Sequence, residues 1–149
     1  MDTQYAVCRL VAVGFALLAA THASADSVGQ VKVSKGSVSI ERAGKRIPGP
    51  VGTNVESSDT VVTGADGSAG ITFIDNSRLS LGPNSTLAIN RFNFDQTTHE
   101  GKFDTSLKRG TLSVVSGKLA KRSPDAMTVS TPSTILGVRG TEFVVRAGE

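Results

Sequence analysis

The chain has 149 residues, of which 38% are hydrophobic and 19% are charged, and its formal net charge is +3. This composition is typical of a globular protein and excludes a disordered or fibrous chain. The mild excess of basic residues and the aromatic content of only 5% argue against a nucleic-acid surface, so we predict no nucleic-acid partner.

Residues 1–25 have the pattern of a secretory signal peptide. Arg9 precedes a short apolar run, Val11–Ala20, and small residues follow up to Ala25. The apolar run is shorter than the roughly 20 residues that a membrane-spanning helix needs. We therefore predict cleavage after Ala25, a periplasmic or secreted product, and no transmembrane span after cleavage.

The remaining residues, 26–149, predict a single compact all-β domain with little or no helix. Val, Ile and Thr outnumber Ala and Leu there, which favours extended strands over helices. The only cysteine of the chain, Cys8, precedes the predicted cleavage site, so the domain must be held by its core without disulfides. Hydrophobic residues alternate with a period of two in Val31/Val33, Val38/Ile40, Ala69/Ile71/Phe73, Leu79/Leu81, Leu87/Ile89, Phe92/Phe94, Leu112/Val114 and Met127/Val129.

A short turn recurs in the middle of the chain. Asp66-Gly67-Ser68, Asp75-Asn76-Ser77 and Pro83-Asn84-Ser85 stand nine and then eight residues apart, and alternating apolar residues follow each of them. Glycine and asparagine at the middle position tolerate positive φ. Such spacing predicts equivalent strands with their apolar side chains on one face. It fits a short solenoid-like arrangement and a rolled antiparallel sheet equally well.

The later part of the chain predicts two loops, a break between strands and a single helical turn. Asp95–Gly101 is polar and has no apolar anchor, so we expect an exposed loop, and Arg122–Asp125 predicts a second one. Arg109-Gly110 separates two apolar runs and predicts a strand break. The only candidate for helix is one turn near Lys118–Lys121.

Several motifs resemble the FecR protein domain. They comprise Gly36–Gly44, Asp59–Ala69, Ile71–Ser77 and the closing segment Thr131–Phe143, in which a Thr-Pro pair is followed by Gly-Val-Arg-Gly-Thr-Glu-Phe. The closing segment is the specific part, and the likeness covers roughly residues 30–145. The residues that we assign to the fold motif are Gly64, Asp66, Gly67, Asp75, Asn76, Thr131, Pro132, Gly137 and Gly140.

The resemblance implies a periplasmic all-β module, often solenoid-like. In iron-uptake regulators, this module helps to relay the occupancy of an outer-membrane receptor to an anti-sigma segment at the inner membrane. The sequence has no cytoplasmic helical domain, membrane span or downstream receptor-signalling subdomain. We therefore expect the sensor module alone, exported free.

The residue types needed for catalysis or metal binding are scarce. After residue 25 there is one histidine, His99, and no cysteine, so a His/Cys zinc site and a cysteine nucleophile are both excluded. Asp66 and Asp75 occupy turn positions, where aspartate has a structural role. We predict that the protein is not an enzyme and has no catalytic residue, no metal site and no cofactor.

The segment Gly137–Thr141 is the most distinctive local feature, and it allows two interpretations. Outward-facing backbone N–H groups, Arg139 and Thr141 could bind a carboxylate or phosphate. Alternatively, Gly137 and Gly140 serve a tight turn and close strand approach, and Arg139 caps a carbonyl or pairs with an acidic neighbour. We favour the structural interpretation and keep Arg139 and Thr141 as candidate recognition residues.

Basic residues are concentrated between residues 102 and 122. They either form solvated surfaces or create a basic face for an anionic envelope polymer or an acidic protein. The leading hypothesis is a binding or signalling module that docks an envelope protein or ligand through a sheet face or edge. The alternative is a structural or adhesive envelope protein that attaches to cell-wall glycan or anionic lipid through the basic face. The candidate recognition residues of this stretch are Lys108, Arg109, Lys118, Lys121 and Arg122.

Overall fold

The computed structural model describes residues 26–140 and 142–148. The predicted export segment and Thr141 lie outside the described residues. The described part consists of β-strands with one short helix, which confirms the all-β prediction. The elements are β1 (Ser27–Lys35), β2 (Val38–Arg42), β3 (Lys45–Pro48), β4 (Asn54–Glu56), β5 (Thr60–Thr63), β6 (Ser68–Phe73), β7 (Arg78–Leu81), β8 (Thr86–Phe94), β9 (Gly101–Val115), α1 (Lys118–Arg122), β10 (Met127–Ser130), β11 (Ile135–Val138) and β12 (Glu142–Ala147).

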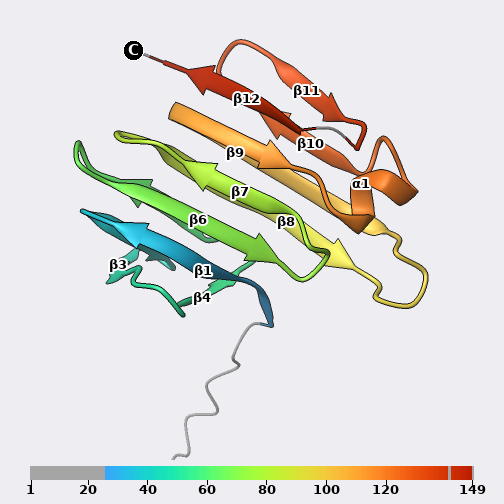
Figure 1. The fold of residues 1–149 in the computed structure, drawn as a ribbon, viewed down its shortest axis with the longest axis horizontal. Coiled ribbons are helices and arrows are strands. Elements are labelled where there is room, and N and C mark those ends of the chain that lie inside the picture. The colour runs from blue at the N-terminus through green and yellow to red at the C-terminus, as the bar shows by residue number, and fades with distance from the viewer. Residues whose placement is uncertain (1–25, 141, 149) are drawn as a thin grey trace, which may run out of the picture.

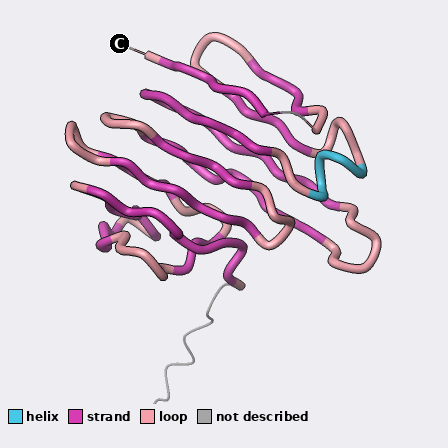
Figure 2. The backbone as a smooth tube through the Cα atoms, viewed as in Figure 1, coloured by secondary structure: helices cyan, strands magenta, loops and turns pink. Residues whose placement is uncertain are grey.

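The strands form one curled sheet with two layers that share strand β9 (Figures 1 and 2). The first layer has the order β4-β1-β6-β7-β9-β12, and the second has the order β3-β2-β5-β8-β9-β10-β11. The N-terminal part of β9 pairs with β8 and β10, whereas its C-terminal part pairs with β7 and β12. All neighbouring strands are antiparallel except β9 and β10. Of the two arrangements left open by the sequence, the structure is the rolled sheet.

The hydrophobic core lies between the two layers. Phe73 of the first layer contacts Phe92 and Phe103 of the second, with ring centroids 5.4 and 4.7 Å apart. Phe92 and Phe103 also contact each other edge to face at 4.7 Å. Buried Val, Ile and Leu side chains from both layers surround this aromatic cluster and form a single continuous core.

The predicted alternation fails at one place. Val31 is buried, but Val33 is 46% exposed, because the pairing of β1 with β6 shifts register between these two residues. A bulge of this kind adds one residue to one strand and turns the following side chains to the other face. Val33 therefore lies on the outer surface of the first layer.

The chain crosses between the layers at corners that stack on one another, at the end of the sheet opposite α1 (Figure 1). Gly64 N–H donates to the carbonyl of Ser37, and Asn84 N–H donates to the carbonyl of Gly64, both at 2.9 Å. Thr111 N–H donates to Ser85 Oγ at 3.0 Å. We call this stack the corner ladder; its members are residues 36–37, 64–67, 82–85 and 109–111.

Close packing explains Gly67 and Gly110 of the corner ladder. Gly67 was expected at a positive φ, but it does not have one; a Cβ there would overlap the carbonyl of Ser37. Asn76 and Asn84 do have positive φ, at 66° and 54°. Gly110, with a φ of 96°, bends β9 between the layers, so the predicted strand break at this position is wrong.

The segments between the later strands follow the sequence closely. Helix α1 is the predicted single turn, and its Leu119 is buried. In the polar β8–β9 loop, the Asp95 carboxylate accepts hydrogen bonds from Thr98 N–H at 3.0 Å and Thr97 N–H at 2.8 Å, which lowers the pKa of Asp95. Among the described residues, no helix is both long and apolar enough to cross a membrane.

Candidate interaction surface

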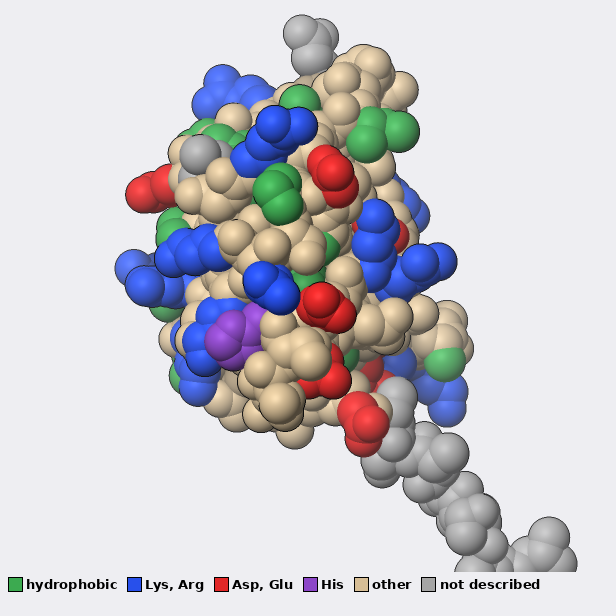
Figure 3. All heavy atoms as spheres, turned by 90° about the vertical axis from the view of Figure 1, so that its right-hand side faces the viewer, with side chains coloured by type: hydrophobic (Ala, Val, Ile, Leu, Met, Phe, Trp, Pro, Cys, Tyr) green, Lys and Arg blue, Asp and Glu red, His purple; other side chains and the backbone are tan. Residues whose placement is uncertain are grey.

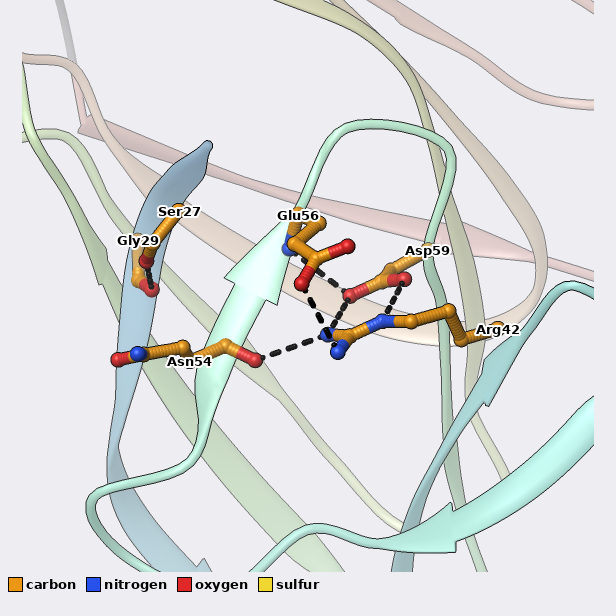
Figure 4. A network of polar contacts seen from close by, with 6 residues as sticks. All are labelled: Ser27, Gly29, Arg42, Asn54, Glu56 and Asp59. Atoms are coloured by element: carbon orange, nitrogen blue, oxygen red, sulfur yellow. Dashed lines mark hydrogen bonds and ion pairs between the residues drawn. The ribbon is translucent and has the colours of Figure 1, made fainter. Parts of the chain in front are cut away.

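The most buried acidic residues hold the fold together. Asp59 is 1% exposed, and its two carboxylate oxygens accept hydrogen bonds from Arg42 Nε at 2.9 Å and Nη2 at 2.7 Å (Figure 4). Arg42 also forms an ion pair with Glu56 at 3.0 Å and donates to the carbonyl of Asn54 at 3.0 Å. The hydrogen bond that Arg42 donates to Asp59 raises the pKa of the Arg42 guanidinium. This network joins the end of β2 to β4 and to the turn before β5.

Asp75 and Asp66 also serve turns. Asp75 is fully buried and accepts hydrogen bonds from Ser77 N–H at 3.0 Å and from Ser77 Oγ–H at 2.7 Å. Ser77 Oγ in turn accepts Gly117 N–H at 3.0 Å, which ties this turn to the end of β9. Asp66 accepts the more distant Ser37 N–H at 3.3 Å. Each of these carboxylates therefore has a local structural partner.

The predicted basic stretch does not form one face. Lys108 and Arg109 lie at the bend of β9, whereas Lys118, Lys121 and Arg122 belong to α1 at the other end of the molecule. On the end that carries α1 and the β8–β9 loop, Lys and Arg side chains are interspersed with Asp and Glu side chains (Figure 3).

Arg109 lines a shallow pocket together with Arg146. Sequence reasoning did not identify Arg146 as a candidate residue. Arg109 Nε donates to the carbonyl of Asn84 at 3.3 Å, which holds one side of its side chain. The pocket has a volume of about 430 Å³, and none of the described residues that line it is acidic. It could accommodate an anion. Its lining residues are Pro83, Asn84, Arg109, Gly110, Thr111, Arg146 and Gly148.

The closing segment forms the β10–β11 hairpin and then crosses to β12. Thr131 N–H donates to the carbonyl of Thr134 at 2.8 Å, and Thr134 N–H donates to Thr131 Oγ1 at 3.1 Å. The threonine of the Thr-Pro pair thus closes the turn with both its backbone and its hydroxyl. Pro132, exposed in the turn, has no N–H that would need a partner.

The two glycines after this turn differ in their structural role. Gly140 has a φ of 68°, so it serves the turn between β11 and β12 as expected. Gly137 has no positive φ, and a Cβ there would meet no atom of the described residues within 4 Å. The structural interpretation is therefore wrong for Gly137. Among the described residues, the exposed Arg139 forms no ion pair.

Each layer has an edge strand on the β9 side of the sheet, β12 in the first layer and β11 in the second, besides β4 and β3 at the other side. β11 pairs only with β10, and β12 pairs only with β9, so the other edge of each strand lacks a neighbour among the described residues. These two strands carry the most exposed large hydrophobic side chains, Ile135 at 73% and Val144 at 65%. We call the free edges of β11 and β12, with Ile135 and Val144, the open end of the roll (Figure 1).

The open end could not be found by sequence reasoning alone. Ile135 and Val144 lie in apolar runs, and such residues normally indicate core positions. Only the pairing of strands reveals which of them lie at an edge. The closing signature did, however, direct attention to Gly137 and Arg139, which belong to the same segment.

Comparison with protein-family models matches residues 59–149 to the family described as FecR protein. Comparisons with curated proteins and with solved structures found no match. The matched residues extend from the turn before β5 through β12, and they include three of the four corners and the open end.

Proposed function

Because this chain belongs to the FecR protein family, we propose that residues 26–149 form a periplasmic, non-enzymatic binding and signalling module. FecR domains are regulatory and signalling domains rather than enzymes, and they are generally associated with the cell envelope. The module docks a protein of the envelope by accepting one of its strands at the open end.

The open end is the single observation that carries this proposal. A free strand edge presents unpaired N–H and C=O groups. Another extended segment can form hydrogen bonds with these groups and so add a strand to the sheet. Ile135 and Val144 add exposed apolar surface at the same place, one on each layer. Isolated apolar residues are common on protein surfaces, but here the two most exposed ones lie on two of the four edge strands among the described residues, β11 and β12.

Charged substitutions at the open end should abolish docking. When the full chain is used to capture proteins from envelope extract, the Ile135→Lys/Val144→Lys variant should retain at least about 10-fold less of a saturable partner than the wild type. A lysine on an edge strand opposes strand addition because its ammonium group would have to be desolvated. The folded state should persist, since both side chains already face solvent.

Val51→Lys provides the matched control, because Val51 is 61% exposed but lies in the turn before β4. The control should capture the partner as the wild type does. Equal capture by the double variant and the wild type would exclude the open end as the docking site. Failure to find any saturable partner for the wild type under several growth conditions would reject the proposed function.

The Arg109 pocket supports a second candidate function, attachment to an anionic envelope polymer. Two arginines and no acidic residue are found among the described residues that line this pocket, and arginine favours planar carboxylate and phosphate groups. If this attachment operates, the full chain should sediment with purified cell wall at low salt and be released as salt rises, because screening weakens contacts between exposed charges.

The Arg109→Gln/Arg146→Gln variant should reduce this co-sedimentation several-fold at low salt. Lys35→Gln/Lys45→Gln removes the same charge from exposed positions outside the pocket and should have little effect. Equal losses in the two variants would indicate general electrostatic attraction and would exclude a site at the pocket.

A further inference from the structure

The exposed edge of β11 has an ordered pattern of backbone groups. Because Thr131 and Thr134 form a hydrogen-bonded pair at the turn, alternation along the antiparallel ladder directs the N–H and C=O groups of Leu136 and Val138 toward β10. The same alternation leaves the N–H and C=O groups of Ile135 and Gly137 at the free edge. These are also the two β11 residues that face solvent.

The side chains along this edge are complementary in size to those of a second, antiparallel copy of the same edge. A bulky exposed side chain, Ile135, and a position without a side chain, Gly137, stand two residues apart on one face of the strand. No described residue occupies the space beside Gly137, and its backbone conformation does not require glycine. Glycine inside a strand weakens it and often marks a place where another backbone or side chain approaches closely.

We propose that β11 pairs antiparallel with β11 of a second copy of this chain, so that Ile135 of each copy packs over Gly137 of the other. In this two-fold arrangement the free backbone groups of Ile135 face those of the second copy's Gly137, and both pairs of contacts are equivalent. The second layers of the two molecules then form one continuous sheet.

Other registers fit the edge less well. Placing Gly137 opposite Gly137 puts two positions without side chains together and sets Ile135 opposite the charged Arg139. Placing Ile135 opposite Ile135 sets Gly137 opposite Ser133, which lies in the turn outside the strand. In the proposed register, Arg139 lies opposite Ser133, so no like charges face each other.

The β11 dimer rests on the proposed function, because both use the same free strand edge. A self-paired β11 edge is closed to any other strand, so the dimer and the docked envelope partner exclude each other. β11 has only four residues, and such a strand buries far less than the roughly 1,000 Å² expected of a stable interface. The dimer is therefore weak, and partner binding can displace it.

Disulfide trapping tests both the contact and its register. The full chain in a Cys8→Ser background contains no cysteine, and Ile135→Cys and Gly137→Cys are made as separate variants. In the proposed register, residue 135 of one copy faces residue 137 of the other at a Cα separation of about 5.5 Å, which suits a disulfide. Two copies of residue 135 are offset by two residues and lie roughly 8–9 Å apart, beyond disulfide reach.

Under mild oxidation of purified protein, the mixture of the two variants should give at least about 5-fold more disulfide-linked dimer than either variant alone. A mixture of Gly137→Cys with Val51→Cys measures random collision between exposed thiols. Absence of cross-linking above that level in the first mixture would overturn the proposal, and equal cross-linking in the single variants would overturn its register. Circular dichroism identical to that of the wild type would establish that the variants are folded.

The two proposals fail independently. Trapping is performed on purified protein without an envelope partner, so a missing partner would leave the cross-linking result unchanged. Conversely, a chain that does not cross-link but still captures a partner, and loses it in the Ile135→Lys/Val144→Lys variant, would reject the dimer alone.

Discussion

A Gly110→Ala variant is expected to lose a large part of the folding stability of the domain. Gly110 has a φ of 96°, which strains any residue with a side chain, and its added Cβ would lie 2.5 Å from Ser85 Cα in the next corner. Backbone strain and overpacking together cost about 2–6 kcal/mol, against a total stability of roughly 5–15 kcal/mol. The thermal midpoint measured by circular dichroism should fall by about 4 °C per kcal/mol lost.

Gly137→Ala is the matched control for this change. The added methyl group enters open space and the backbone is not in the left-handed region, so stability should change by no more than about 0.5 kcal/mol. If both variants melted at the same temperature as the wild type, the bend of β9 against the Ser85 corner would be incorrectly described.

Truncation of Phe103 should have a comparably large effect. Its ring is fully buried and contacts Phe73 and Phe92, which come from different layers, at 4.7 Å each. Replacing a buried phenylalanine with alanine costs about 3–5 kcal/mol through lost apolar burial and the cavity left behind. Chemical denaturation of Phe103→Ala should show a reduced midpoint with a single cooperative transition.

Phe94→Ala is the control for this second prediction. Phe94 is only partly buried and stacks on His99 at 5.9 Å, near the β8–β9 loop. Its truncation should cost at most about half as much as that of Phe103. A larger loss from Phe94 than from Phe103 would contradict a core centred on the three-phenylalanine cluster.

The features that could be predicted from the sequence are those that depend on short stretches of chain. Alternation identifies a half-buried strand wherever the pleat is regular, as in Leu79/Leu81 and Leu112/Val114, which are all buried. It fails at Val33 because a bulge depends on the pairing with β6, a strand far along the chain. It fails at Gly110 for a related reason: the glycine permits a sharp bend, and only the two-layer packing decides whether a strand ends there or continues.

The candidate site was predictable only in part. The closing motif pointed to Gly137 and Arg139, because an unusual spacing of glycines around an arginine is visible in one segment. Arg146 could not be associated with Arg109, because the two come together only when β12 pairs with β9. Exposure of Ile135 was equally hidden, since a hydrophobic residue in a strand indicates burial until the order of strands is known.

The double membership of β9 has a consequence for how the molecule comes apart. Its first part hydrogen-bonds to β8 and β10 and its second part to β7 and β12, so neither layer has a complete set of neighbours without it. Neither layer can therefore detach while the other keeps its fold, so the β9 amides should exchange their hydrogens only through global opening. A protease cut at the bend would therefore yield two interdependent fragments, neither of which could hold a fold by itself.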